Sequence, residues 1–318
     1  MTLAAVVIGR NEGQRLVRCL ASLQGRASPV VYVDSGSTDG SPEAAESAGA
    51  IVVELDLSRP FTAARARNAG LARLGEIDPE GDHVQFLDGD CEIVPGWIEA
   101  ALETLTGDSG LAVVCGRRRE RHPEASLWNR LIDAEWDTPV GEALECGGDA
   151  LMRRAALAEV GGYRDSIIAG EEPELCFRLR QKGWRIRRID VEMTRHDAAL
   201  SKFSQWWKRT SRGGHAFAEC AALHGRSAER FRVAETRRAL VWGAGLPLAL
   251  LVGLALFGGW ALALLLALPA QVVRLRFRGF DWTNAFFLTL GKFPEAQGVA
   301  SYWTGRLLGR RRQIMEYK

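Results

Sequence analysis

Five short apolar runs, separated by segments with helical spacing, constrain the fold of this chain more than any other feature. Apolar residues recur every three to four positions in the intervening segments 12–23 and 64–74, as on one face of a helix. Strands that alternate with helices form a mainly parallel sheet covered on both faces, so the sequence predicts an α/β fold. Such sheets bind ligands beyond the carboxyl ends of their strands. The runs are LAAVVI (3–8), VVYVD (30–34), AIVVEL (50–55), HVQFL (83–87) and LAVVC (111–115).

A stretch without any charged residue lies between Arg238 and Arg274. A membrane-spanning helix needs about 20 apolar residues, and this run is longer than one such helix but short for two. Gly258–Gly259 near its middle indicates a turn, and arginines flank both ends, which by the positive-inside rule puts both ends in the cytosol. We therefore expect a tight or re-entrant helical hairpin over residues 239–273. A buried helix pair in a soluble core is the alternative.

Charge and cysteine content exclude several classes of protein. The chain has 41 basic and 39 acidic residues, and a net charge of +2 provides no field for binding nucleic acid. Its six cysteines stand singly, without the spacing of a zinc site or a disulfide scaffold, so a reducing compartment fits best. Met1 is followed directly by a strand-like run that lacks the features of a signal peptide. We expect the N-terminal part to stay in the cytosol.

Carboxylates stand at or just after the ends of two predicted strands. Asp34 ends one run, and Asp88 and Asp90 follow another. Residues two apart in an extended segment face the same way, so Asp88 and Asp90 can bind one cation, with Gly89 allowing close approach of the backbone. Oxygen ligands suit Mg²⁺ or Mn²⁺, which commonly bridge a carboxylate to substrate phosphates. A solvated turn is the alternative, because Asp-Gly is also a common turn dipeptide.

Further polar residues point to the same edge of the sheet. The Asp34 carboxylate can accept a hydrogen bond from a base N–H or a ribose hydroxyl, although the loop after it also suits a helix cap. Pro173 fits the first turn of a helix, which leaves Glu171 and Glu172 at a helix N-terminus, where the helix dipole alone favours acidic residues. His196 follows a strand-like run and is a candidate metal ligand. The dinucleotide and P-loop glycine motifs do not occur.

Six motifs in a fixed order resemble the inverting nucleotide-sugar glycosyltransferases of family 2, which have a GT-A fold. The resemblance covers roughly residues 3–200, and it rests on order and spacing, because each motif is weak alone. It implies a Rossmann-like, mainly parallel sheet with helices on both faces, followed here by the C-terminal hydrophobic hairpin. The motifs are VVIGRNE, VDSGSTDGS, ARARNAGL, FLDGDCEIVPGW, GGDALMRRAALAEVGGY and GEEPELCFRLRQKGW, with His196 after them.

The resemblance also implies roles for individual positions. Glu171 and Glu172 match a Glu-Asp pair whose second member is the proposed base. Because that member is a glutamate here, one methylene longer, the choice between Glu172 and Glu171 stays open. By position, the nucleotide is bound by Glu12, Asp34, Arg67, Asn68 and Asp88, the metal by Asp88, Asp90 and His196, and the sugars are approached by the loop of Asp149.

The mechanism that this resemblance implies depends on a divalent cation. Mn²⁺ or Mg²⁺ stabilises the leaving nucleoside diphosphate, while the base takes the proton of the acceptor hydroxyl as it attacks the anomeric carbon. One displacement inverts the anomeric centre. Lys208, Arg209 and Arg212 come after the site in the chain, where they can meet pyrophosphate, lipid phosphate or anionic headgroups.

Three functions are consistent with these features. The first is transfer of a sugar from a nucleotide diphosphate sugar to a lipid-linked or envelope glycan acceptor, at the inner membrane with the catalytic domain facing the cytosol. The second is transfer directly onto a polyprenyl phosphate. The third is a non-catalytic membrane scaffold, which requires damage among the acidic positions that the sequence does not show. The expected parts are a catalytic domain (1–200), a basic helical connector (201–238), the membrane hairpin (239–273) and an interfacial amphipathic, basic segment (274–318).

Overall fold

The computed structural model describes residues 3–309, so residues 310–318 of the expected interfacial segment lie outside the described part. The chain divides into two compact units, Met1–Ser201 and Lys202–Lys318. The first unit carries every acidic residue that the sequence points to, and the second carries the long uncharged run.

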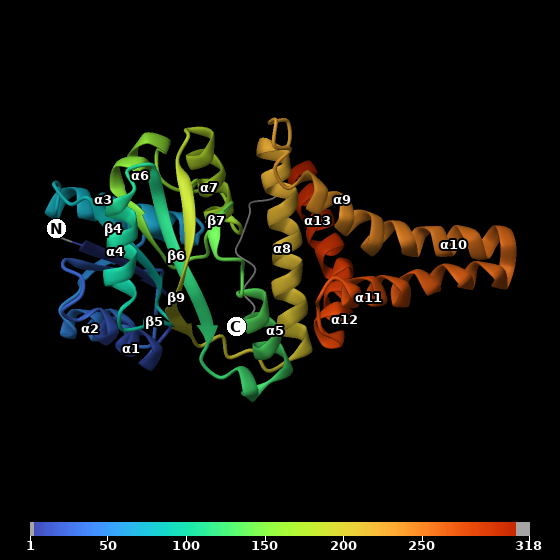
Figure 1. The fold of residues 1–318 in the computed structure, drawn as a ribbon, viewed down its shortest axis with the longest axis horizontal. Helices are drawn as coiled ribbons and strands as arrows, with labels where there is room; N and C mark the ends of the chain where they lie inside the picture. The colour runs from blue at the N-terminus through green and yellow to red at the C-terminus, as the bar shows by residue number, and fades with distance from the viewer. Residues whose placement is uncertain (1–2, 310–318) are drawn as a thin grey trace. The chain divides into compact units, whose positions relative to one another are not determined.

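The first half of unit 1 alternates strands with helices (Figure 1). In chain order its elements are β1 (Leu3–Gly9), α1 (Gln14–Leu23), β2 (Val30–Asp34), α2 (Ser41–Ser47), β3 (Ile51–Glu54), α3 (Ala63–Ile77) and β4 (His83–Asp88). These four strands pair with one another in parallel, and β1 lies between β2 and β4. Val6 and Val7 point to opposite faces of β1 and neither has exposed surface, as in a sheet covered on both sides.

The second half of unit 1 turns the sheet into a mixed one. Its elements are β5 (Cys91–Ile93), α4 (Trp97–Gly107), β6 (Leu111–Glu120), η1 (Pro123–Ala125), α5 (Leu127–Glu135), β7 (Gly141–Ala143), β8 (Ala150–Arg153), α6 (Arg154–Val160), α7 (Glu171–Gln181) and β9 (Arg185–His196). Strand β8 runs antiparallel between β4 and β6, and β9 is parallel to β6 but antiparallel to β5 and β7. The sheet order is β3-β2-β1-β4-β8-β6-β9-β5, with β7 paired to β9.

The α/β class predicted from the sequence is therefore confirmed, while parallel pairing dominates only the first half of the sheet. The physical reason is the length of the antiparallel strands. Strands β5 and β7 have three residues each and β8 has four, so none of them contains an apolar run long enough to detect.

Unit 2 is helical. Its elements are α8 (Phe203–His224), α9 (Val233–Leu240), η2 (Val241–Gly245), α10 (Leu246–Phe257), η3 (Gly258–Leu266), α11 (Ala267–Phe277), α12 (Trp282–Leu290) and α13 (Lys292–Leu307). Helices α8, α9 and α13 share a small buried cluster formed by Ala218, Ala239, Val299 and Tyr302. By length and composition, one helical stretch of the described residues is able to cross a membrane, Val233–Phe277.

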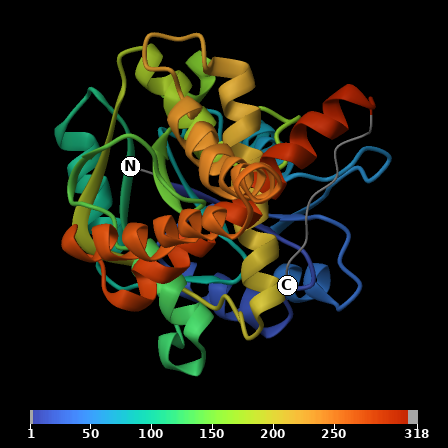
Figure 2. The ribbon, with the colours of Figure 1, turned by 90° about the vertical axis from the view of Figure 1, so that its right-hand side faces the viewer.

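The backbone inside this stretch leaves helical geometry at Gly258, where φ is 57° and ψ is −144°. A left-handed φ of this kind favours glycine. A Cβ built on Gly253 would lie 2.9 Å from the Cβ of Ala261, whereas residues eight apart in a straight α-helix are about 12 Å apart. The chain therefore folds back at Gly258, and Figure 2 views the two arms end-on.

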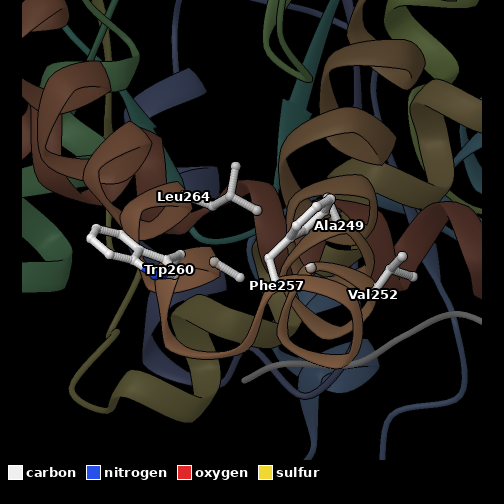
Figure 3. Close-up of a pocket in the computed structure, with 7 residues that line it drawn as sticks. Ala249, Val252, Phe257, Trp260 and Leu264 are labelled. Carbon is white, nitrogen blue, oxygen red and sulfur yellow. The ribbon is translucent and has the colours of Figure 1, made fainter.

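An open apolar groove of about 720 Å³ lies between the two arms near Gly258 (Figure 3). It is lined from α10 by Ala249, Val252, Gly253 and Phe257, and from η3 by Trp260, Ala261 and Leu264. The indole of Trp260 is 87% exposed, so a large aromatic side chain stands free at the end of the arms.

Candidate active site

Asp90 and His196 come together through the pairing of β5 with β9. The antiparallel register sets Cys91 opposite His196, so the residue before β5 lies beside the residue that ends β9. Nε2 of His196 lies 3.2 Å from Oδ2 of Asp90, and both side chains are buried. Donor atoms of Asp90, Cys91 and His196 all lie within 4.8 Å of one another.

These donors fit a divalent cation. Burial raises the pKa of the Cys91 thiol well above its ordinary value, with the Asp149 carboxylate adding to the effect, and sulfur is a softer ligand than Mg²⁺ or Mn²⁺ prefers. The carboxylate of Asp90 and the imidazole of His196 remain. An oxygen and a nitrogen donor that face each other across 3.2 Å are able to bind one cation together.

Asp88 ends β4 at the same edge of the sheet, but two arginines hold its carboxylate. Nη2 of Arg67 donates to Oδ1 at 2.8 Å, and Nη2 of Arg118 donates to Oδ2 at 3.3 Å. The Asp88 side chain is 29% exposed, whereas that of Asp90 is 4% exposed. The two carboxylates expected to share one cation therefore lie in different surroundings, Asp90 against His196 and Asp88 against two guanidinium groups.

Asp149 is fully buried and supports Asp88. Its Oδ1 accepts the backbone N–H of Asp88 at 3.0 Å, and its Oδ2 accepts Nε of Arg118 at 2.9 Å and the hydroxyl of Thr194 at 2.7 Å. The side chain of Asp149 therefore faces the interior, and the approach of its loop to the sugars stays a prediction. Asp149 directly precedes β8, which lies between β4 and β6, so the side chain is enclosed by the sheet.

Arg67 connects the carboxylate of Asp88 with the start of α7. Its side chain is only 2% exposed, and its Nη1 lies 2.8 Å from Oε1 of Glu172 and 3.1 Å from Oε1 of Glu171. The guanidinium thus meets three carboxylates, and its contact with a nucleotide stays a prediction.

Glu172 has the electrostatic character of a general base. Burial raises its pKa from 4.5 to about 7, the neighbouring Glu171 carboxylate adds to the increase, and the Arg67 guanidinium opposes it. A base is most efficient when its pKa lies near the working pH. The Glu172 side chain is 13% exposed and that of Glu171 is 6% exposed, so Glu172 is also the more accessible of the two.

Asn68 holds the loop that leads into α7. Its Nδ2 donates to the carbonyl of Tyr163 and to Oδ1 of Asp165, both at 2.7 Å, and its Oδ1 accepts the N–H of Tyr163 at 2.9 Å. The amide is fully used by these contacts. Asn68 thus fixes the loop before the two glutamates, and its contact with a nucleotide stays a prediction.

Asp34 organises the loop after β2. Its carboxylate accepts four hydrogen bonds, from the N–H groups of Gly36 and Ser37, the hydroxyl of Ser37 and the hydroxyl of Tyr32. A carboxylate has about four acceptor positions, so a bound base would exchange with one of these partners. The Asp34 side chain is buried at the carboxyl end of β2, where the sequence predicts a ligand contact.

Glu12 packs against the turn between Asp88 and Asp90. A Cβ on Gly89 would lie 3.2 Å from the carbonyl oxygen of Ile8 and 3.3 Å from Cγ of Glu12, so the turn has little space for any residue other than glycine. Oε2 of Glu12 pairs with Nη2 of Arg15 at 2.8 Å.

The three basic candidates Lys208, Arg209 and Arg212 lie on α8 in unit 2, with Lys208 exposed and the others half-buried.

Two site residues on β6 were missed in the sequence, Arg118 and Glu120. Both are charged, both are enclosed by the fold, and they are two residues apart, so they point to the same side of the strand. The signal that indicates them is the charged continuation GRRRE of the apolar run LAVVC, since charges at alternate positions of a central strand need buried partners.

Comparisons with known proteins identify the family of this chain. Residues 5–161 match the family model described as glycosyl transferase family 2. The pre-mycofactocin glycosyltransferase of Mycobacterium tuberculosis is 29% identical over 241 residues, covering 69% of this chain and 47% of that protein. The N-acetylglucosaminyl-diphospho-decaprenol L-rhamnosyltransferase of the same species is 27% identical over 221 residues, covering 57% and 71%. The chain thus spans about half the length of the first of these relatives.

Solved structures share the fold. A mannosyltransferase from Pyrobaculum calidifontis, in complex with GDP-Man and Mn²⁺, superposes with a TM-score of 0.64 at 21% identity, covering 92% of this chain and 86% of that chain. Glucosyl-3-phosphoglycerate synthase from Mycobacterium tuberculosis, in complex with Mn²⁺, UDP and glucosyl-3-phosphoglycerate, has a TM-score of 0.52 at 20% identity, covering 70% and 79%. These likenesses confirm the GT-A-like fold expected from the sequence.

Proposed function

The chain carries a glycosyltransferase family 2 domain, and on this premise we propose that it moves a sugar from a nucleotide diphosphate sugar to a lipid-linked or envelope glycan acceptor. The observation that carries the proposal is the composition of one sheet edge. A buried metal-ligand pair, Asp90 and His196, shares that edge with a carboxylate base, Glu172, whose pKa lies near neutral pH. Inverting transfer requires both parts, a stabilised leaving group and a base for the acceptor hydroxyl.

The residues that would hold Mn²⁺ or Mg²⁺ are Asp90 and His196, and Asp88, whose carboxylate contacts Arg67 and Arg118, would complete the site. When bound, such a cation acts as a Lewis acid that stabilises the charge of the leaving diphosphate. Structures of similar fold contain Mn²⁺ beside GDP-Man and beside UDP, which supports a divalent cation in this chain without choosing between the two metals.

The chain's own residues perform the other tasks. Glu172 accepts the proton of the acceptor hydroxyl at its carboxylate as that hydroxyl attacks the anomeric carbon from the side opposite the leaving group. Arg67 orients Glu172 through their 2.8 Å ion pair, and Asp149 fixes the backbone of Asp88. Because the sugar is displaced once, its anomeric centre inverts.

We expect a ligand screen by thermal shift to test the donor site directly. UDP, GDP and dTDP are tested with and without Mn²⁺, and one of them should raise the melting temperature in a metal-dependent way.

In Asp34→Ala, calorimetry should show nucleotide affinity weakened about tenfold or more, because the loop of Gly36 and Ser37 loses the acceptor that orders it. Asp39→Ala, on the same loop but exposed, is the matched control. Unchanged affinity in Asp34→Ala would refute its role at the base.

The membrane assignment rests on the two helical arms. Their apolar side chains are strongly exposed, Leu256 at 68%, Phe257 at 67% and Leu266 at 68%, and arginines stand at the base of both arms. Water is a poor solvent for such a surface, whereas a bilayer with anionic headgroups matches both its apolar and its basic parts. A relative whose name includes a decaprenol-linked sugar supports a lipid-linked acceptor. The arginines at both ends of the hairpin are the reason for placing the catalytic unit on the cytosolic side of the inner membrane.

Cysteine labelling in intact cells tests this topology. All six native cysteines are buried, so the parent protein serves as the unlabelled control. Ser301→Cys on α13 should be protected from a membrane-impermeant maleimide until the cells are lysed, because both ends of the hairpin are cytosolic. Labelling before lysis would refute the hairpin. Gly259→Cys at the turn then distinguishes a full crossing, with early labelling, from a re-entrant loop, with none. Quantitative recovery of the parent protein in the soluble fraction without detergent would exclude both the full crossing and the re-entrant loop.

A further inference from the structure

Glu120 is a buried carboxylate at the end of β6, with no exposed side-chain surface. Within residues 3–309, no arginine or lysine pairs with it. Its Oε1 accepts the N–H of His122 at 3.2 Å and Nδ2 of Asn129 at 3.3 Å, and its Oε2 accepts the N–H of Ala198 at 3.1 Å. An ionised carboxylate in such surroundings requires a positive partner, and these neutral donors do not supply one.

The group that faces Glu120 is His196. The register of β6 with β9 sets the two residues side by side, and Nδ1 of His196 lies 3.6 Å from Oε2 of Glu120. Nδ1 is buried and makes no hydrogen bond in this structure. The other ring nitrogen, Nε2, faces Asp90 at 3.2 Å. The imidazole therefore stands between two buried carboxylates.

We propose that Glu120 is a positioning residue for the cation site, which accepts Nδ1–H of His196 and thereby presents the Nε2 lone pair to a divalent cation beside Asp90. This inference rests on the proposed function. A histidine that binds a metal through one nitrogen usually donates the other N–H to a carboxylate or carbonyl, which fixes its tautomer. Charge agrees with this arrangement, because one divalent cation balances the charge of the two buried carboxylates, Asp90 and Glu120.

The ring of His196 is also held from the side. The indole of Trp136 packs edge-on against it, with ring centroids 4.9 Å apart at 85°. Rotation that would turn Nε2 away from Asp90 is therefore opposed by Trp136, while Glu120 would accept the proton at Nδ1 once a cation occupies Nε2. The two contacts have separate effects, since only the carboxylate distinguishes the tautomers.

The experiment measures Mn²⁺ binding, from the electron paramagnetic resonance signal of the free ion, with UDP and GDP tested in parallel. Glu120→Gln should raise the Kd for Mn²⁺ about tenfold or more, within the range of 10- to 100-fold that is typical for outer-shell carboxylates. Glu124→Gln, on the same segment but with a 75% exposed side chain, should leave the Kd unchanged. His196→Ala should weaken binding at least as much as Glu120→Gln.

The double variant Glu120→Gln with His196→Ala separates positioning from a general effect on the fold. If Glu120 acts through His196, adding Glu120→Gln to His196→Ala should raise the Kd for Mn²⁺ by less than a further twofold. If Glu120→Gln raises the Kd as much in the His196→Ala background as it does alone, the inference is overturned. A normal Kd in Glu120→Gln, with a weakened one in His196→Ala, would also overturn it and leave the metal site intact. A normal Kd in His196→Ala would remove the proposed metal site itself. If Glu120→Gln does not fold, Glu120→Asp replaces it, and less than a twofold change in Kd then contradicts the role.

Discussion

Asp90→Asn is expected to abolish sugar transfer, lowering kcat/KM by about 10³-fold or more. The amide is a weaker ligand for a hard cation than the carboxylate, and the lost stabilisation of the leaving diphosphate amounts to several kcal/mol at about 1.4 kcal/mol for each factor of ten. The side chains have the same shape, so the melting temperature should change little. Initial rates at increasing Mn²⁺, together with calorimetry of nucleotide binding, measure the effect.

The control for Asp90→Asn is Asp82→Asn, an exposed aspartate on the loop before β4 that should behave like the parent protein. In the Asp90 variant, the part of nucleotide binding that depends on metal should disappear. Transfer that continues in this variant and in the presence of EDTA would show that the cation site has been assigned wrongly.

Glu172→Gln should preserve donor binding and lower kcat by about 10²- to 10⁴-fold, the usual contribution of a general base. Glu171→Gln, its neighbour in the sequence, should have the milder effect, because that side chain is less accessible and faces the same arginine. Single-turnover rates and nucleotide affinity, measured on both variants, separate the loss of chemistry from the loss of binding. A larger loss of kcat in Glu171→Gln would assign the base to Glu171.

The pH profile gives a second readout for Glu172. With a pKa of about 7, the carboxylate is increasingly protonated below neutral pH, so log kcat should fall with a slope of one on the acid side. Glu172→Gln should lose this acid limb of the pH profile.

The raised pKa of Glu172 also affects the stability of the fold, in the opposite direction. The folded state binds this proton more tightly than the unfolded state. The contribution of Glu172 to the free energy of unfolding is therefore fully present below its ordinary pKa of 4.5 and is lost as the pH rises through about 7.

The sequence predicted those parts of the molecule that local pattern determines. The apolar runs identified β1, β2, β3, β4 and the first half of β6, and the helical spacing identified α1 and α3. The carboxylates at strand ends were found because parallel strands finish at a common edge. Pro173 and the two glutamates before it correctly marked the start of α7.

What the sequence could not indicate were interactions between distant segments. Arg118 is 30 residues from Asp88 in the chain, and Glu120 is 76 residues from His196, and no local pattern relates either pair. Asp149 follows two glycines and looks like a loop residue in the sequence. It directly precedes the four-residue strand β8, however, and its side chain is therefore buried at the sheet. These contacts depend on the order of strands in the mixed half, which the short strands β5, β7 and β8 determine.

Arg67 and Asn68 are consecutive residues of α3, and together they restrain the start of α7, where Glu172 lies. Arg67 forms ion pairs with the two glutamates at the start of α7, and Asn68 binds the loop just before that helix. The start of α7 is therefore expected to move together with α3 and not independently of it. If Glu172 is the base, its position is fixed before the acceptor binds, so the acceptor hydroxyl has to approach Glu172.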